Sequence, residues 1–166
     1  MALLALPGMI GGAEQVSAAP VANRPITRDD IDHWAAAWNT HDIKRVLALF
    51  SPNVRIDQPS DPQFLDDEGA RGFFTVIFRA YSDFHIKVTQ TIIEGTNAVS
   101  VDRVTGTWRG IYVDPATGRS TPGNGRTFDH PGAMVIHYAP DHPITLVSIY
   151  RDQLTVDRQL GVVPKP

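Results

Sequence analysis

The first third of the chain carries apolar residues at helical spacing. A helix is predicted to begin after Thr27, because Asp30 three residues later forms an imperfect capping box. The apolar face of this helix consists of Ile31, Trp34, Ala35 and Trp38. Asp42 has the character of an N-cap for a second helix over residues 43–50, which repeats the spacing. A broad apolar face predicts a third helix over about 66–81.

From Phe84 onward the period of the apolar positions changes from 3.6 to 2, which predicts strands. A short strand is also predicted at 53–57, before the third helix. The strands of the second half are predicted at about 84–94, 99–108, 127–138 and 145–151. Asp152 is predicted to cap a final short helix that ends at Gly161. This order of elements is typical of an α+β fold in which helices pack on one face of a curved sheet.

The chain has 166 residues, the usual size of one domain, and we expect that domain to span residues 26–163. Residues 1–25 lack a periodic apolar face and have two interpretations. They are either a disordered extension or the remnant of an export signal, because Val16-Ser17-Ala18 fits a signal-peptidase site while a positively charged start is missing. The first interpretation implies a cytoplasmic protein and the second an exported or periplasmic one, so localisation stays open.

Composition narrows the possible partners. Fifteen Lys plus Arg and eighteen Asp plus Glu give a net charge of −3 without a long run of either sign, so we expect no nucleic-acid partner and no membrane partner. The chain has no cysteine and no Gly-rich phosphate loop, and we expect no cofactor. Histidines and aspartates gather at Asp129, His130, His137, Asp141 and His142. We expect no metal there, because His130 and His137 differ by an odd number along one strand and face opposite ways.

Three stretches carry a family resemblance. They are Trp38-Asn39-x-His41-Asp42, Gly106-Thr107-Trp108-Arg109-Gly110, and the tail that runs from Tyr150-Arg151-Asp152 to Arg158-Gln159-Leu160-Gly161. With the order of elements, they resemble the SnoaL-like polyketide cyclases of the ketosteroid-isomerase-like superfamily. The resemblance implies a cone-shaped, curved, mixed or antiparallel sheet with three N-terminal helices and a short C-terminal helix. It leaves the reaction open, because the superfamily includes isomerases, cyclases, dehydratases, epoxide hydrolases and binding domains.

The resemblance implies three catalytic candidates. Asp152 falls where the cyclases and limonene epoxide hydrolases place an acid or base, although it could simply cap the last helix. Arg103 matches the arginine of the epoxide hydrolases by position and could pair with Asp152, but Thr105 stands where their first acid would be. The histidine of the cyclases falls on Met134, and His130, four residues earlier, is a possible helper. His33 and Asp57 could reach the pocket mouth or be plain surface residues.

We expect an apolar pocket for a small molecule. Its predicted substrate-binding residues are Trp34, Trp38, Phe74, Trp108, Met134 and Tyr150, for each of which a place in the core is the alternative. The resemblance implies a cofactor-independent enzyme of cyclase or isomerase type that uses Asp152 as acid or base. A non-catalytic binding domain and an epoxide hydrolase or hydratase are the alternatives. We also expect a homodimer through the outer sheet face, with Val147 and Ile149 in the contact.

Overall fold

Four helices and seven strands follow one another in the part of the chain that the computed structural model describes, residues 25–58, 67–114, 117–141 and 143–163. The helices are α1 (Arg28–Asn39), α2 (Ile43–Leu47), α3 (Asp67–Ala80) and α4 (Gln153–Leu160). The strands are β1 (Phe50–Asp57), β2 (His85–Glu94), β3 (Asn97–Thr107), β4 (Tyr112–Val113), β5 (Ser120–Thr121), β6 (Thr127–Tyr138) and β7 (Ile144–Arg151). The predictions for residues 1–24, for Asp66 and for His142 lie outside the described residues.

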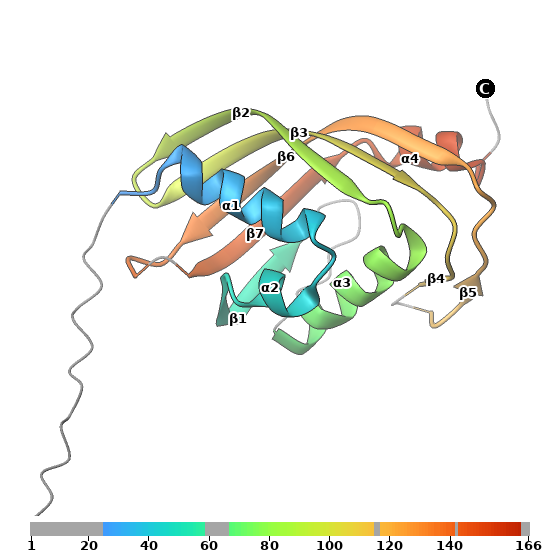
Figure 1. The fold of residues 1–166 in the computed structure, drawn as a ribbon, viewed down its shortest axis with the longest axis horizontal. Helices are drawn as coiled ribbons and strands as arrows, with labels where there is room; N and C mark the ends of the chain where they lie inside the picture. Colours follow the sequence, from blue (N-terminus) through green and yellow to red (C-terminus); the bar gives the residue numbers. More distant parts are fainter. Residues whose placement is uncertain (1–24, 59–66, 115–116, 142, 164–166) are drawn as a thin grey trace, which may run out of the picture.

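Five of the strands form one mixed sheet in the order β1-β7-β6-β3-β2, in which β1 runs parallel to β7 and the other neighbours are antiparallel. The sheet is strongly curved, and α1 and α3 lie on the same side of it (Figure 1). α4 packs against β6 at the far end of the sheet from the start of α1. The predicted α+β class is confirmed.

Two boundaries differ from the sequence prediction. The second helix ends at Leu47 and Phe50 already belongs to β1, because the carbonyl of Leu49 accepts a hydrogen bond from Ile144 N at 2.8 Å and thereby joins the chain to β7. The segment between the predicted strands 99–108 and 127–138, where no strand was predicted, contains the short pair β4 and β5. Apolar periodicity cannot detect two-residue strands of this kind.

The Trp-Asn-x-His-Asp stretch joins α1 to the sheet. The Asn39 amide donates to Ile86 O at 2.9 Å and accepts from Ile86 N at 2.8 Å, as an added strand would. His41 Nε2 hydrogen-bonds Phe84 O at 2.7 Å, and Asp42 caps α2 by accepting from Lys44 N at 2.9 Å. The stretch that carried the family resemblance therefore has a structural role, which is to fix the angle between the first helices and β2.

Trp38 is the centre of an aromatic core between α1, α3 and the sheet. Its ring centroid lies 4.7 Å from Phe74 and 5.5 Å from Trp34. The exposed fraction is 0% for Trp34, 1% for Trp38, 0% for Phe74 and 4% for Met134. Packing of this density makes these four side chains part of the hydrophobic core rather than ligand contacts of the main cavity.

The two faces of β7 are the reverse of the prediction. Arg151 pairs with Gly132 and Ile149 with Met134, so Arg151, Ile149 and Val147 all face the interior. Val147 and Ile149 are 1% and 3% exposed and cannot form a dimer contact. Tyr150, 49% exposed, points outward and does not line the cavity.

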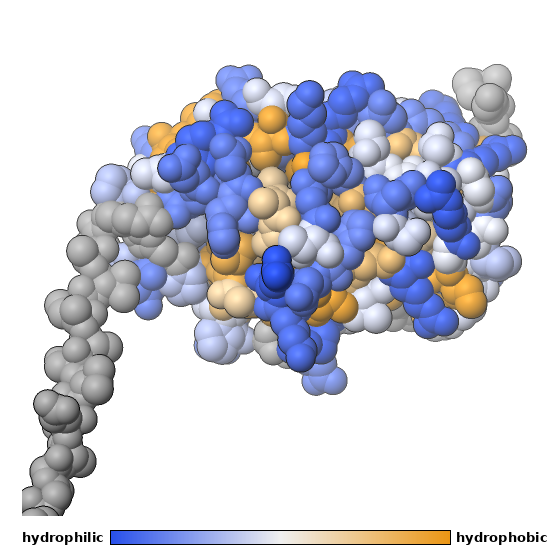
Figure 2. Space-filling view, in the orientation of Figure 1, coloured by the Kyte–Doolittle hydropathy of each residue, from blue (hydrophilic) through white to orange (hydrophobic). Residues whose placement is uncertain are grey.

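The face of the molecule shown in Figure 2 is mostly hydrophilic, with hydrophobic side chains in small patches.

Candidate functional site

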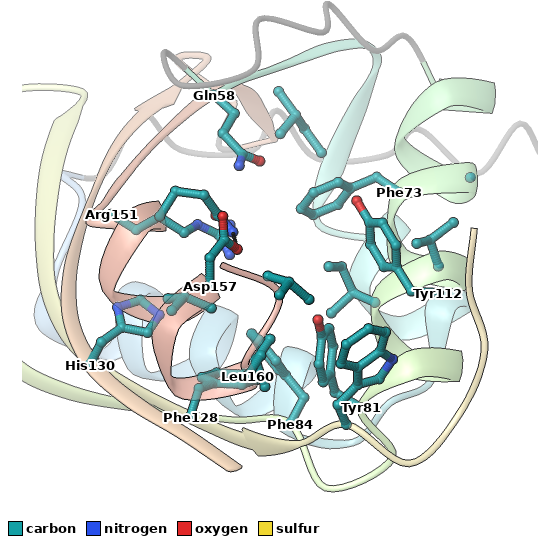
Figure 3. Close-up of a pocket in the computed structure, with 18 of the residues that line it drawn as sticks. Gln58, Phe73, Tyr81, Phe84, Tyr112, Phe128, His130, Arg151, Asp157 and Leu160 are labelled. Atoms are coloured by element: carbon teal, nitrogen blue, oxygen red, sulfur yellow. Dashed lines mark hydrogen bonds between the residues drawn. The ribbon is translucent and has the colours of Figure 1, made fainter. Parts of the chain in front are cut away.

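A cavity of about 480 Å³ lies between α3, α4 and the inner face of the sheet. Most of its wall is apolar, and the apolar lining includes Phe73, Ile77, Phe84, Trp108, Phe128 and Leu160. Arg151, Asp157 and His130 stand on one side, facing Phe73, Tyr112 and Tyr81 on the other (Figure 3). A concave, apolar space of this size with a few convergent polar groups is typical of a small-molecule site.

Trp108 is held in the cavity wall by the backbone around it. The backbone N–H of Trp108 donates to Arg126 O at 2.8 Å, and the backbone N–H of Thr107 donates to Asp83 Oδ1 at 2.7 Å. Arg109 forms an ion pair of 2.7 Å with the same carboxylate. Gly110 comes so close to α3 that a Cβ atom would lie 1.8 Å from Arg79 O. The Gly-Thr-Trp-Arg-Gly stretch thus fixes Trp108, one of the residues predicted for the pocket, in the cavity wall.

His130 is a buried imidazole with a defined tautomer. It is 2% exposed, and its Nδ1 lies 2.8 Å from the carbonyl oxygen of Pro131. Because a carbonyl oxygen can only accept, Nδ1 carries the proton and Nε2 of the neutral ring keeps its lone pair. Nε2 has no hydrogen-bond partner among the described residues. A basic nitrogen without a hydrogen-bond partner in the described part of the chain is therefore buried in a residue of the cavity wall.

The surroundings of His130 keep this ring neutral. Burial lowers the pKa of His130 below its usual value, because desolvation disfavours the imidazolium, and the positive charge of Arg151 lowers it further. The hydrogen bond to Pro131 and the carboxylates of Asp129 and Asp152 oppose this effect only in part. At neutral pH the ring is ready to accept a proton.

Arg151 and Asp157 are cavity residues that the sequence pattern did not identify. Arg151 ends β7 with its side chain inward, and Asp157 lies one helical turn after Gln153, whose Nε2 donates to Asp157 Oδ1 at 2.8 Å. Two patterns could have indicated them: Val147, Ile149 and Arg151 alternate on one strand face, and Asp157 sits between the apolar residues Val156 and Leu160.

Asp152 lies outside the cavity, contrary to the prediction. It is exposed and caps α4: Oδ1 accepts from Thr155 N at 3.0 Å and Oδ2 from Thr155 Oγ1 at 2.6 Å. These hydrogen bonds hold the pKa of Asp152 below its usual value. Because Arg151 takes the inward position at the end of β7, the next residue turns outward, where the α4 N-terminus needs an acceptor. The alternative interpretation, a helix cap, describes its contacts.

We therefore expect Asp152→Asn to keep any activity or ligand affinity within about twofold of wild type, because asparagine caps helices as well as aspartate does. Asp152→Ala should lower the melting temperature without changing ligand affinity, since it removes both acceptors of Thr155. Thermal unfolding and calorimetric ligand titration of the two variants check this. A large loss of activity in Asp152→Asn, with the fold intact, would restore the catalytic role.

Arg103 also lies outside the cavity. Its side chain is 56% exposed and pairs with Asp129, with Nε 2.7 Å from Oδ1 and Nη2 2.8 Å from Oδ2. On β3 the buried residues Asp102 and Val104 face inward, so Arg103 between them faces outward. The predicted pair of Arg103 with Asp152 across the pocket is therefore wrong.

The remaining candidates lie away from the cavity as well. His33 is exposed and borders a shallower cleft beside α1, and Asp57 precedes the cavity residue Gln58.

Within the described residues, no group of three His, Asp or Glu side chains could hold a metal ion. No helix in that part of the chain is long and apolar enough to cross a membrane.

Comparisons with known proteins bear on family and fold. The profile of the SnoaL-like domain matches residues 31–146, well over half of the chain. No curated protein sequence matches significantly. The fold is similar to AclR, a candidate hydroxylase from Streptomyces galilaeus (15% identity, 83% of this chain, 82% of that chain, TM-score 0.69).

Two further solved structures are similar over most of their length. One is a candidate polyketide cyclase from Xanthomonas campestris pv. campestris (19% identity, 80% of this chain, 94% of that chain, TM-score 0.68). The other is a candidate SnoaL-like polyketide cyclase from Jannaschia sp. CCS1 (21% identity, 85% of this chain, 97% of that chain, TM-score 0.68). A protein from Catenulispora acidiphila with a ketosteroid isomerase-like fold is similar as well (19% identity, 85% of this chain, 100% of that chain, TM-score 0.67). The chain belongs to the SnoaL-like family and has the ketosteroid isomerase-like fold.

Proposed function

We propose that this chain is a cofactor-independent enzyme of cyclase or isomerase type, which moves a proton on an apolar small molecule, with His130 as the general base. One observation carries the proposal: a buried, neutral imidazole presents an Nε2 that has no partner among the described residues, in the wall of an apolar cavity. A base that is neutral at the working pH can remove a proton from carbon next to a carbonyl. His130 takes the role that the family resemblance gave to Asp152.

Two neighbours suit the same chemistry. Burial raises the pKa of Tyr81 to about 12, so its hydroxyl stays protonated and can donate to an oxygen that gains negative charge. The imidazolium that forms at His130 can return the same proton to a different atom of the substrate, and the carboxylate of Asp157 lies in the same wall. One base that removes and returns the proton, with a hydroxyl that donates to the oxygen, is what a proton shift requires.

The proposal is tested by proton exchange, which can be followed whatever the final product is. The chain is incubated in D₂O with a panel of fused-ring ketones and 1,3-dicarbonyl compounds, and the signals of the protons next to the carbonyl are followed by ¹H NMR. We expect loss of these signals faster than in buffer. Compounds that bind tightly without exchange would instead support the non-catalytic binding domain.

No observation favours the epoxide-hydrolase alternative. In the described part of the chain, Arg103 and Thr105 lie on the outer side of β3 and neither lines the cavity. The arrangement of an arginine between two acids, which the epoxide hydrolases have, is therefore not formed at these positions. Solvent oxygen in the product of an apolar epoxide would be needed to revive it.

We also propose that the chain forms a homodimer through the outer sheet face. The contact residues differ from those predicted, since Val147 and Ile149 face inward, and the outward positions of β2 and β7 carry Ile92 and Tyr150, exposed at 55% and 49%. Exposed apolar residues on an uncovered sheet face favour self-association. Light scattering should give twice the 18.2 kDa chain mass, and Tyr150→Lys should lower it. A monomer at micromolar concentration would contradict this.

A further inference from the structure

We infer that the substrate is an apolar monocarboxylate whose carboxylate binds Arg151, while its apolar body fills the rest of the cavity. The inference rests on the proposed function for its site and names the substrate class of that site. It begins from the inward position of Arg151 at the end of β7, next to the basic nitrogen of His130.

Arg151 has no partner among the described residues that neutralises its charge. Its Nε is buried without a hydrogen-bond partner there, and the ion pairs within 4 Å in the same part of the chain belong to Arg28, Arg45, Arg103 and Arg109. Burial lowers the pKa of Arg151, yet a guanidinium remains charged at neutral pH. Buried charges in proteins are normally paired, so an enclosed guanidinium without an anion indicates a position for a ligand anion.

Three of the groups that face this position are compatible with an anion. Tyr81 and Tyr112 line the cavity opposite Arg151, and the Tyr81 hydroxyl stays protonated. His130 is neutral. Asp157 is a carboxylate on the same side of the cavity as Arg151; its Oδ1 accepts a hydrogen bond from Gln153 Nε2 at 2.8 Å, so a ligand anion must bind Arg151 away from it. The planar guanidinium matches the two oxygens of a carboxylate, which gives this group a geometric advantage over a single ketone oxygen.

The apolar part of the cavity indicates the shape and polarity of the rest of the substrate. Phe73, Phe128 and Leu160 provide apolar surface, and the volume of about 480 Å³ accommodates a fused-ring or branched aliphatic body. An amphipathic acid would place its body on these side chains and its charge on Arg151.

The experiment compares acids with amides of the same shape. Isothermal titration calorimetry measures the binding of benzoate and benzamide, of 2-naphthoate and 2-naphthamide, and of the corresponding anthracene pair to the full chain. We expect each acid that binds to bind about tenfold or more tightly than its amide, because a charge-assisted hydrogen bond contributes more than a neutral one. Arg151→Met should abolish this preference, and Arg103→Met on the outer face should keep it.

The controls separate this inference from the proposed function. Arg151→Met should raise the melting temperature, because it removes an unpaired buried charge, and amide binding by this variant shows that the cavity is intact. His130→Gln should keep the preference for the acid while losing proton exchange. Equal affinity of wild type for acids and amides, or a preference that survives in Arg151→Met, would overturn the carboxylate assignment and leave the His130 proposal standing. Failure of every pair to bind would overturn the carboxylate assignment as well, whatever exchange the ketone panel shows.

Discussion

His130→Gln should lower the rate of proton exchange by about 10²- to 10⁴-fold with little change in KM, because a general base acts in the transition state rather than in binding. Glutamine can accept a hydrogen bond at this position but cannot take up a proton at neutral pH. The measurement is the initial rate of deuterium incorporation for any ketone that wild type exchanges. His137→Gln, on the outer face of the same strand, is the matched control and should exchange like wild type.

The pH dependence gives this prediction a second readout. Exchange requires neutral His130, and its pKa lies below the ordinary value of 6.5, so the rate should fall only as the pH drops below that value. The same shift affects stability: the unfolded chain takes up this proton at a higher pH than the folded chain does. The free energy of unfolding therefore decreases as the pH falls from 6.5 toward the lowered pKa of folded His130. Unchanged exchange in folded His130→Gln would exclude this residue as the base.

Asp102→Asn should stabilise the protein at pH 8 and have little effect at pH 4.5. Asp102 lies on the inner face of β3 and is 1% exposed. Its Oδ1 accepts from Ser100 Oγ, and its Oδ2 has no hydrogen-bond partner in the described part of the chain. Burial raises the pKa of Asp102 to about 6, because the carboxylate form is poorly solvated there. Asparagine keeps the acceptor for Ser100 and carries no charge.

The sign of this effect follows from proton linkage. Between the unfolded pKa of about 3.9 and the folded value near 6, the folded chain binds more protons, so stability falls as the pH rises through this range. Above pH 6 Asp102 is ionised in both states, and the destabilisation by its buried charge is complete. Asp102→Asn removes this charge and should raise the unfolding free energy by about 2 to 3 kcal/mol at pH 8. Urea unfolding at the two pH values measures it, with the exposed Asp141→Asn as control. A gain of equal size at both pH values would show that the charge of Asp102 is not its cause.

The periodicity of the sequence predicted which segments become helices and strands, but not which strand face is buried. On β3 the polar residues Ser100 and Asp102 point inward, while Val99 and Val101 point outward. This alternation is the reverse of what hydropathy favours, and it is possible because the side chains of Ser100 and Asp102 hydrogen-bond each other inside the sheet. Arg103 was assigned to the pocket by its match in position to the arginine of the epoxide hydrolases, and the same alternation places it on the outer face.

The end of β7 shows the same difficulty at the candidate site. The family resemblance drew attention to Asp152, and Tyr150 was expected to share its wall, yet Arg151 between them is the residue in the cavity. A shift of one residue reverses the direction of every side chain on a strand. The register of β7 against β6 decides this direction, and that register is a tertiary contact that a single strand does not encode.

The cavity itself combines segments that are far apart in the sequence. Gln58 follows β1, Tyr81 follows α3, His130 lies on β6 and Asp157 on α4. Trp108 was predicted as one of the aromatic residues of an apolar pocket, and His130 because the family resemblance implied a strand histidine nearby. Asp157 was missed although it sits between Val156 and Leu160, because a polar residue on a short helix is usually a surface residue.

The protonation of His130 is the most direct test of the proposed mechanism, because the base must be neutral and must carry its proton on Nδ1. Long-range ¹H–¹⁵N NMR of the full chain at pH 7 distinguishes the two neutral tautomers and the imidazolium, and His130→Gln assigns the signals. We predict the Nδ1-protonated tautomer at pH 7 and a titration midpoint below 6.5. An imidazolium at pH 7, or a ring with its proton on Nε2, would contradict the assignment of His130 as the base.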